Sequence, residues 1–559
     1  MHITVYERDR GFVIEKLLEG EFDYIDTGDE VFEADFFRYI GANGILKKLA
    51  ESYPSPRKKH DVPVWLALGS GISMRLHGAE AFNQYEYVIR CGGMMNAFGP
   101  DFGSKYADND NNGNIKIACN GFNEKNSYPR DTPCHQDYLR KYYRDTDVGR
   151  AEYWYNTDVA KLFKKRHAYD KQGLFIGDAT YIFVPDNPKY ERSNKLLFDK
   201  HNHPVDPKKI RKAELKAGKY QWRRCYKLVT LLHVYPDLDC FLIVGFRLLP
   251  GKDSELPAFY ELLDTFVDAV GQGVVKRLIL DRGFLDGERI GKVKRVHGID
   301  VLIPVRKNMD IYQDAVGLID EVDFFDYKIP SNISKPDGQT ESKPDTIAKR
   351  EAKRLRTIKK KTKPHPAKPP DEQVISRQVG VLNNFDSWSS CPVPLSVVYC
   401  RDNYADGHSD QWLLLDTKSG TDVDPSQSRD EYRLRVQIEE RYRQLKCFTD
   451  LMGFTSRSFS LVFHQIMTVL LAYSLVQLYL RRLKRAELNR KPLPNIRKQL
   501  LPAAAYVIVY CEGKVAFLDR LEYSDILLSL EGEPRLKARQ RIRRLRRESA
   551  LLSEMRKPP

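Results

Sequence analysis

Apolar and polar positions alternate with a different period in successive parts of the chain. Up to about residue 165 the apolar residues recur at helical spacing, most clearly over 63–76 and 147–166, which predicts a mostly helical region. Farther along, short apolar runs predict strands over 174–184, 228–234, 241–249, 277–281 and 301–305. Helices are expected between them, over 256–270 and 286–296. This order predicts an α/β fold, with a mixed sheet flanked by helices.

The alternation is interrupted between residues 307 and 428. Lys, Pro and polar residues dominate 331–370, and the basic run 349–361 within it is typical of a solvated loop or helix. Further strands are expected over 395–398 and 412–415, and helices over 430–448, 459–483 and 535–547. We therefore divide the chain into a helical N-terminal domain (1–165), an α/β core (166–306 and 429–483), an insertion before the last core helices (307–428) and a basic C-terminal region (484–559).

The charge balance indicates a polyanionic partner. The 559 residues carry a formal net charge of +15, and a basic excess of this size is typical of proteins that bind nucleic acid or a membrane surface. The most apolar stretch, 461–480, contains His464, Gln465 and Gln477, so we expect a buried helix there and not a membrane span. No secretory leader pattern is present at the start. We therefore expect a cytoplasmic protein whose partner is nucleic acid and not a membrane.

Two familiar metal-binding patterns are excluded. The nine cysteines are scattered without zinc-site spacing, so we expect reduced thiols. The polar loop 107–113 imitates the start of a calcium loop, but Cys119 stands where a bidentate Glu is required. His201 and His203 are expected to be solvated, with no metal role.

Two aspartates lie in or at the end of apolar runs. Asp178 is inside one predicted strand and Asp281 ends another, and a carboxylate in such a place costs free energy unless it is paired or bound to metal. One such Asp alone is more often a cap or an ion-pair partner. Two of them with a helical Glu downstream favour an oxygen-rich site for hard divalent cations. Two ions about 4 Å apart support phosphoryl transfer without a nucleophilic side chain.

The third acid is indicated by its spacing. Tyr432, Arg435, Glu439 and Lys446 follow one another at steps of three, four and seven residues. On one continuous helix all four would lie along one face. A phenol, two cations and an acid on one face suit a phosphodiester and its metal. The alternative is a solvated charged face.

The same spacing resembles a known family. Tyr-x-x-Arg-x-x-x-Glu followed by Lys446 is similar to the YREK signature of bacterial insertion-sequence transposases, the DDE enzymes of the insertion sequence four group, which share an RNase H-like catalytic core. The segment 281–284 resembles the surroundings of the family's second acid. The segments 175–178, 301–307 and 412–417 resemble its neighbouring strands. The resemblance covers residues 173–483.

The resemblance implies a role for each matched position. The ligands of two Mg²⁺ ions, for which Mn²⁺ would substitute, would be Asp178, Asp281 and Glu439. The residues that contact the DNA backbone would be Tyr432, Arg435, Lys446, Arg306 and Lys307. Trp412 stands where a relative holds a flipped base by stacking; the equally weighted alternative is an ordinary core aromatic.

The implied function is cut-and-paste DNA transposition. The partners would be the terminal inverted repeats of the transposon and target DNA, bound by a homodimer near the bacterial nucleoid. Residues 1–165 would read the ends, while the basic segments 349–361 and 535–547 would neutralise phosphates. The alternatives are a non-catalytic DNA-binding protein derived from a transposase and an RNase H-like nuclease. A basic protein of the membrane surface is disfavoured because no lipid motif is present.

Overall fold

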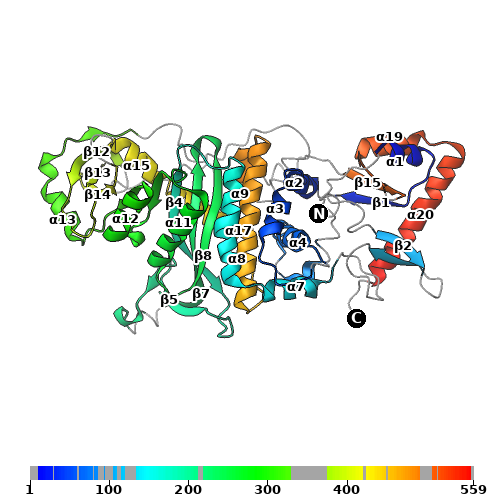
Figure 1. The fold of residues 1–559 in the computed structure, drawn as a ribbon, viewed down its shortest axis with the longest axis horizontal. Helices are drawn as coiled ribbons and strands as arrows, with labels where there is room; N and C mark the ends of the chain where they lie inside the picture. Colours follow the sequence, from blue (N-terminus) through cyan, green and yellow to red (C-terminus); the bar gives the residue numbers. More distant parts are fainter. Residues whose placement is uncertain are drawn as a thin grey trace. The chain divides into compact units, whose positions relative to one another are not determined.

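The computed structural model describes most of the chain (Figure 1). The described residues are 10–28, 31–59, 62–79, 81–85, 88, 94, 105–109, 115–119, 134–211, 214, 218–328, 374–418, 423–448, 451–490, 506–512 and 514–555. They divide into two compact units, residues 1–275 with 437–559 and residues 276–436. The basic run predicted at 349–361 lies outside the described residues.

An antiparallel sheet forms the centre of the first unit. Its strands are β4 (Leu174–Val184), β5 (Asn194–Phe198), β6 (Pro204–Val205), β7 (Gln221–Tyr235) and β8 (Cys240–Pro250). β7 pairs with β4, β5 and β8. It is buried from Cys225 to Val234, which explains why most residues of this stretch are apolar, with Lys227, Thr230 and His233 as the buried polar exceptions. The strands predicted at 174–184, 228–234 and 241–249 are confirmed.

Helices cover this sheet. They include α8 (Val148–Trp154), the π-helical segment η3 (Tyr155–Val159), α9 (Ala160–Lys165), α11 (Glu255–Val270) and α17 (Phe459–Arg482). α17 runs alongside α8 and β8 (Figure 1). Among the described helices, α17 has the length and hydropathy to cross a membrane, but 89% of its most apolar window is buried inside the fold. The prediction of a buried helix is therefore confirmed.

N-terminal helices pack beside α17. They are α2 (Val31–Ala42), α3 (Ile45–Ser52), α4 (Val64–Leu76) and α7 (Gln136–Asp145). The Tyr143 hydroxyl donates to the carbonyl of Ala67 at 2.7 Å, and Ser460 of α17 donates to the carbonyl of Tyr143 at 2.8 Å. One chain of hydrogen bonds thus joins α4, α7 and α17. Between α4 and α7 along the chain, β2 (Lys105–Asn109) and β3 (Ile115–Cys119) pair as a hairpin.

The two ends of the chain share a hydrophobic core, which we call the terminal module. It comprises α1 (Arg10–Leu18), β1 (Tyr24–Gly28), β15 (Tyr506–Cys511), β16 (Lys514–Asp519), α19 (Arg520–Ser529) and α20 (Gly532–Met555). β1 pairs with β15, and Leu17 and Phe22 are buried against Val509 and Leu518. From the sequence we expected these segments in two regions, 1–165 and 484–559. Strands so far apart along the chain leave no local signal of their pairing.

A mixed sheet forms the second unit. Its strand order is β11 (Phe325–Asp326), β12 (Val374–Phe385), β13 (Leu395–Tyr404), β14 (Ser409–Asp416), β10 (Asp300–Pro304) and β9 (Arg277–Leu280). β9 and β10 are parallel, joined through α12 (Gly287–His297) as parallel strands require. The other pairs are antiparallel. α13 (Asp310–Gly317) and α15 (Pro425–Arg433) complete the unit. The predicted mixed sheet with flanking helices is therefore present.

The helix predicted over 430–448 is wrong in its continuity. The chain instead forms α15, which ends at Arg433, and α16 (Val436–Phe448). Between them the amides of Leu434 and Arg435 bond to the carbonyls three residues back, at 2.9 and 3.0 Å, which closes α15 with a tight turn. Each helix packs with a different unit, and such tertiary contacts outweigh the local preference for one long helix.

Candidate active site

Asp281 follows the last residue of β9. Its backbone is extended, and its side chain is 36% exposed. The strand is apolar and buried, so its end brings a charged side chain to partial solvent contact without the full cost of burial. The predicted second acid is therefore accessible to a ligand.

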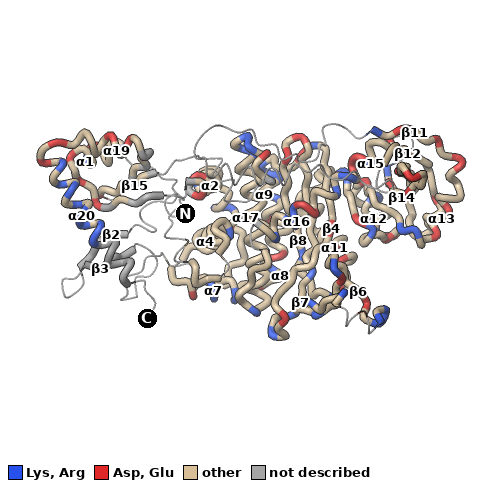
Figure 2. The backbone as a smooth tube through the Cα atoms, turned by 180° about the vertical axis from the view of Figure 1, so that it is seen from behind, with Lys and Arg blue, Asp and Glu red and all other residues tan. Residues whose placement is uncertain are grey.

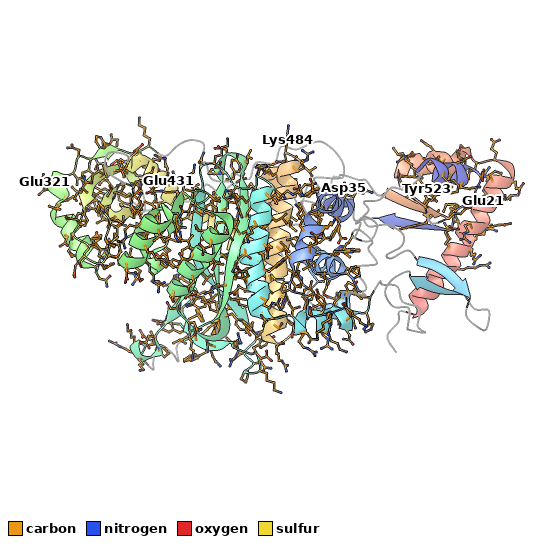
Figure 3. All side chains as sticks on the ribbon, in the orientation of Figure 1. Glu21, Asp35, Glu321, Glu431, Lys484 and Tyr523 are labelled. Carbon is orange, nitrogen blue, oxygen red and sulfur yellow. The ribbon has the colours of Figure 1, made fainter. Side chains whose placement is uncertain are left out.

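A buried ion-pair group fixes the surroundings of Asp281. Arg277, at the start of β9, donates two hydrogen bonds of 2.6 Å to the carboxylate of Asp416 on β14 and one of 2.6 Å to Glu431 on α15. Glu431 is labelled in Figure 3. Burial favours the neutral form of Asp416, but the bonds and charge of Arg277 outweigh it and hold the pKa of Asp416 below its usual value. This group ties α15 to the sheet.

Two predicted phosphate-binding residues lie beside Asp281. Arg435 Nη1 is 4.0 Å from Asp281 Oδ1, and its guanidinium lies 6.0 Å from the ring centre of Tyr432. Burial raises the pKa of Tyr432 to about 12; the charge of Arg435 opposes this shift and that of Asp281 adds to it, so the phenol keeps its proton at neutral pH. Tyr432 is therefore a neutral hydrogen-bond donor next to an acid and a cation.

Trp412 lies next to Tyr432. Their ring centres are 5.8 Å apart with a tilt of 46°, and the guanidinium of Arg429 lies 5.5 Å from the Trp412 ring centre. The indole is half-buried on β14. Trp412 thus shares the neighbourhood of Tyr432 and is not sealed in the core.

Arg306 and Lys307 follow β10 and are exposed. Arg306 donates a 3.0 Å hydrogen bond to the carbonyl of Arg282, the residue after Asp281. Lys307 pairs with Asp410 at 3.1 Å. Arg306 therefore lies close to Asp281, while the ion pair holds Lys307 at the start of β14.

Asp178 lies in the middle of β4, in the first unit. It is directly opposite Thr230 of β7, and its Oδ1 accepts a 2.8 Å hydrogen bond from the amide of Ala179. Side chains two residues apart on a strand, and those directly opposite on the next strand, share a face. Asp178, Thr180 and Thr230 therefore lie on one face of the sheet.

α16 packs on this same face. Tyr442 bonds to the hydroxyl of Thr230 at 2.6 Å, and Lys446 donates to Thr180 at 2.6 Å. Glu439 is three residues before Tyr442 and seven before Lys446, so all three lie on one side of the helix. The helix face that carries Glu439 thus covers the strand positions that flank Asp178.

The charge of Lys446 depends on this packing. Burial lowers the pKa of Lys446 to about 8, and the negative charge of Asp178 opposes that shift. Lys446 is consequently protonated at pH 7 and loses its charge as the pH rises through 8. Burial, with the charge of Asp178 in the same direction, raises the pKa of Tyr442 well above its usual value. This contact pair was not foreseen, although Tyr442 has helical spacing from Glu439 and Thr180 has strand spacing from Asp178.

The prediction that four residues share one helix face is wrong. Glu439 and Lys446 belong to α16, whereas Tyr432 ends α15 and Arg435 lies in the turn between the helices. The structure brings Asp281, Tyr432 and Arg435 together in one unit. It places Asp178 near Lys446 in the other, with Glu439 on the same helix face.

The donor chemistry of the three acids fits a hard divalent cation. Carboxylate oxygens are the ligands that Mg²⁺ prefers. Asp281 is partly exposed and Glu439 is exposed. Arg435 lies beside Asp281, and Lys446 interacts with Asp178, so each aspartate already attracts a positive charge. Across the described parts of both units, no group of three His, Cys, Asp or Glu side chains is gathered as metal ligands.

Comparison with known proteins gives the class of the chain. Residues 167–475, more than half of the chain, match the family described as "Transposase DDE domain". The chain therefore belongs to the DDE transposase family. Its structure is similar to a piggyBac transposase solved by cryo-electron microscopy in a synaptic complex with hairpin DNA, at 10% identity over 94% of this chain and 86% of that one, with a TM-score of 0.31. No curated protein matches the chain.

Proposed function

We propose that the chain is a cut-and-paste DNA transposase of the insertion sequence four group, with an RNase H-like core and a YREK signature. Asp178, Asp281 and Glu439 would hold two Mg²⁺ ions, which Mn²⁺ would replace. One observation carries the proposal: within the range matched by the DDE family, the α16 face with Glu439 packs over the strand positions around Asp178.

The side chains near the acids would position the DNA. Arg435 and Lys446 would bind phosphate oxygens by charge-assisted hydrogen bonds. The protonated phenol of Tyr432 would donate a further hydrogen bond. Bound Mg²⁺ would supply Lewis-acid chemistry at the phosphodiester. Because Lys446 loses its charge near pH 8, its grip on phosphate would weaken above that pH.

The remaining DNA contacts would extend this site. Arg306 and Lys307 would contact the backbone, and the half-buried ring of Trp412 would stack on an unstacked base. Residues 1–165 would read the terminal inverted repeats. A homodimer near the nucleoid of a bacterial cytoplasm would hold two transposon ends together and join them to target DNA.

Cleavage and joining of labelled DNA tests this function. Purified full-length protein is incubated with Mg²⁺ and a duplex that carries the inverted repeats flanking the gene, together with a target plasmid. We expect cuts at the repeat ends and products joined to the plasmid, and neither on a duplex with scrambled repeats. Cuts without joined products would replace the proposal with a nuclease. Specific binding without cuts, in Mg²⁺ or Mn²⁺, would replace it with a DNA-binding derivative.

A further inference from the structure

α20 carries eight basic residues between its start and Arg547. Figure 2 shows Lys and Arg positions in blue on this helix. Part of the helix packs against the core of the terminal module. Ala538 is buried in the core of the terminal module, and Ile542 and Leu545 pack against it. These positions have the spacing of one helix face. The apolar face of α20 between 532 and 547 is therefore already used by the protein's own core.

Two of the basic residues hold the helix in place. Arg541 donates hydrogen bonds of 2.9 and 2.6 Å to the carbonyls of Phe22 and Asp23, just before β1. Lys537 pairs with Glu21 at 3.1 Å and with Glu533 at 3.4 Å (Glu21 is labelled in Figure 3). Their charges have structural partners inside the module.

Four other arginines form a separate row, which we call the arginine ridge. It consists of Arg535, Arg539, Arg543 and Arg546. They follow one another at steps of four, four and three residues, so they lie within one face of the helix. All four are exposed, and in the described part of the chain no hydrogen bond or ion pair of theirs is found. The ridge spans about 16 Å along the helix.

The ridge gives the folded chain no stability of its own. Like charges three or four residues apart on a helix destabilise it. Among the described residues, the arginines of the three neighbouring pairs within the ridge form no ion pair that offsets this cost, whereas Lys537 pairs with Glu21. A row of this kind is matched by a polyanion with closely spaced charges, and a DNA strand carries a phosphate about every 3.4 Å along its axis.

We propose that the arginine ridge binds the phosphate backbone of double-stranded DNA, independently of its sequence. The inference rests on the proposed function only in that DNA is the partner. Duplex DNA is favoured over an anionic membrane because the apolar face that a membrane-bound helix inserts is buried in the module. The contacts would position the protein on DNA and leave the reading of sequence to other residues.

The salt dependence of DNA binding tests the ridge. Full-length protein is titrated with a labelled duplex of unrelated sequence between 50 and 300 mM salt. The fourfold variant Arg535→Gln, Arg539→Gln, Arg543→Gln, Arg546→Gln removes up to four phosphate contacts. We expect the negative slope of log K against log salt to become shallower by about 3 to 4, since each phosphate contact contributes about 0.9 to its magnitude. Affinity at 100 mM salt should fall at least about tenfold, because several charge contacts are lost.

Two control variants separate the ridge from general charge and from folding. Replacing the exposed Lys171, Lys208, Lys252 and Lys484 by Gln removes the same charge elsewhere and should leave the slope nearly unchanged. The fourfold Arg→Lys variant of the ridge keeps the charge and should bind like wild type. An unchanged slope in the Gln ridge variant would overturn the inference. So would a variant that keeps its affinity for DNA but no longer binds phosphatidylserine vesicles. Failure of the proposed function is separate, since it would show as absent cutting in wild type.

Discussion

Replacing Asp281 by Asn should lower the rate of Mg²⁺-dependent DNA cleavage at least about a thousandfold. A carboxylate that holds a catalytic metal contributes several kcal/mol to the transition state, and each 1.36 kcal/mol is a factor of ten in rate. The fold should persist, because the side chain is 36% exposed and Asn has the same shape. Single-turnover cleavage of a labelled repeat-end duplex, with thermal unfolding of the same protein, measures both effects.

Asp286→Asn is the matched control. Asp286 lies five residues along the chain and is exposed to a similar degree, 31%, but it caps α12 by accepting a 3.0 Å hydrogen bond from the amide of Arg289. Asn is as good a helix cap as Asp, so stability and cleavage should both stay close to wild type. Equal loss of cleavage in the two variants would remove Asp281 from its assigned role.

The second large effect is on stability. Arg277→Met should lower the free energy of unfolding of the 276–436 unit by about 3–5 kcal/mol, because it leaves the carboxylate of Asp416 buried without its partner. Glu431 loses its anchor in the same change, so α15, which carries Tyr432, should loosen. Urea denaturation measures the first effect. Hydrogen exchange at residues 425–433 measures the second.

Arg441→Met provides the contrast. Arg441 is also fully buried, yet none of its guanidinium nitrogens has a hydrogen-bond acceptor in good geometry among the described residues, and the group stacks 4.0 Å from the ring centre of Phe241. Because Arg441 has no ion-pair partner among the described residues, its removal leaves no buried carboxylate without a partner, so stability should change little or increase. A loss as large as that of Arg277→Met would show that burial alone, and not the ion-pair group, sets the cost.

Local patterns predicted the core elements well. The strand over 174–184 has the predicted bounds, and the helix predicted over 286–296 is observed at Gly287–His297, after its cap at Asp286. These elements are specified by their own apolar period and end signals. The terminal module could not be predicted, because β1 and β15 are paired across almost the whole chain.

The candidate site was only partly predictable for the same reason. Residue types and spacing singled out Asp281 with Tyr432 and Arg435, and the structure brings these three together. The turn at Leu434 breaks the predicted helix without Pro or Gly, since its cause is packing of α15 and α16 in different units. Likewise, the contact of Lys446 with Thr180 depends on how a distant helix covers the sheet.

The central claim is that Asp178, Asp281 and Glu439 hold the same metal ions. Iron-directed cleavage of the protein backbone tests it without DNA: Fe²⁺ replaces Mg²⁺, and ascorbate with peroxide generates radicals that cut the chain near the bound ion. We predict cuts close to all three acids, suppressed by excess Mg²⁺ and lost in Asp281→Asn. Cuts near one acid only, or cuts that Mg²⁺ does not suppress, would contradict a shared three-carboxylate site.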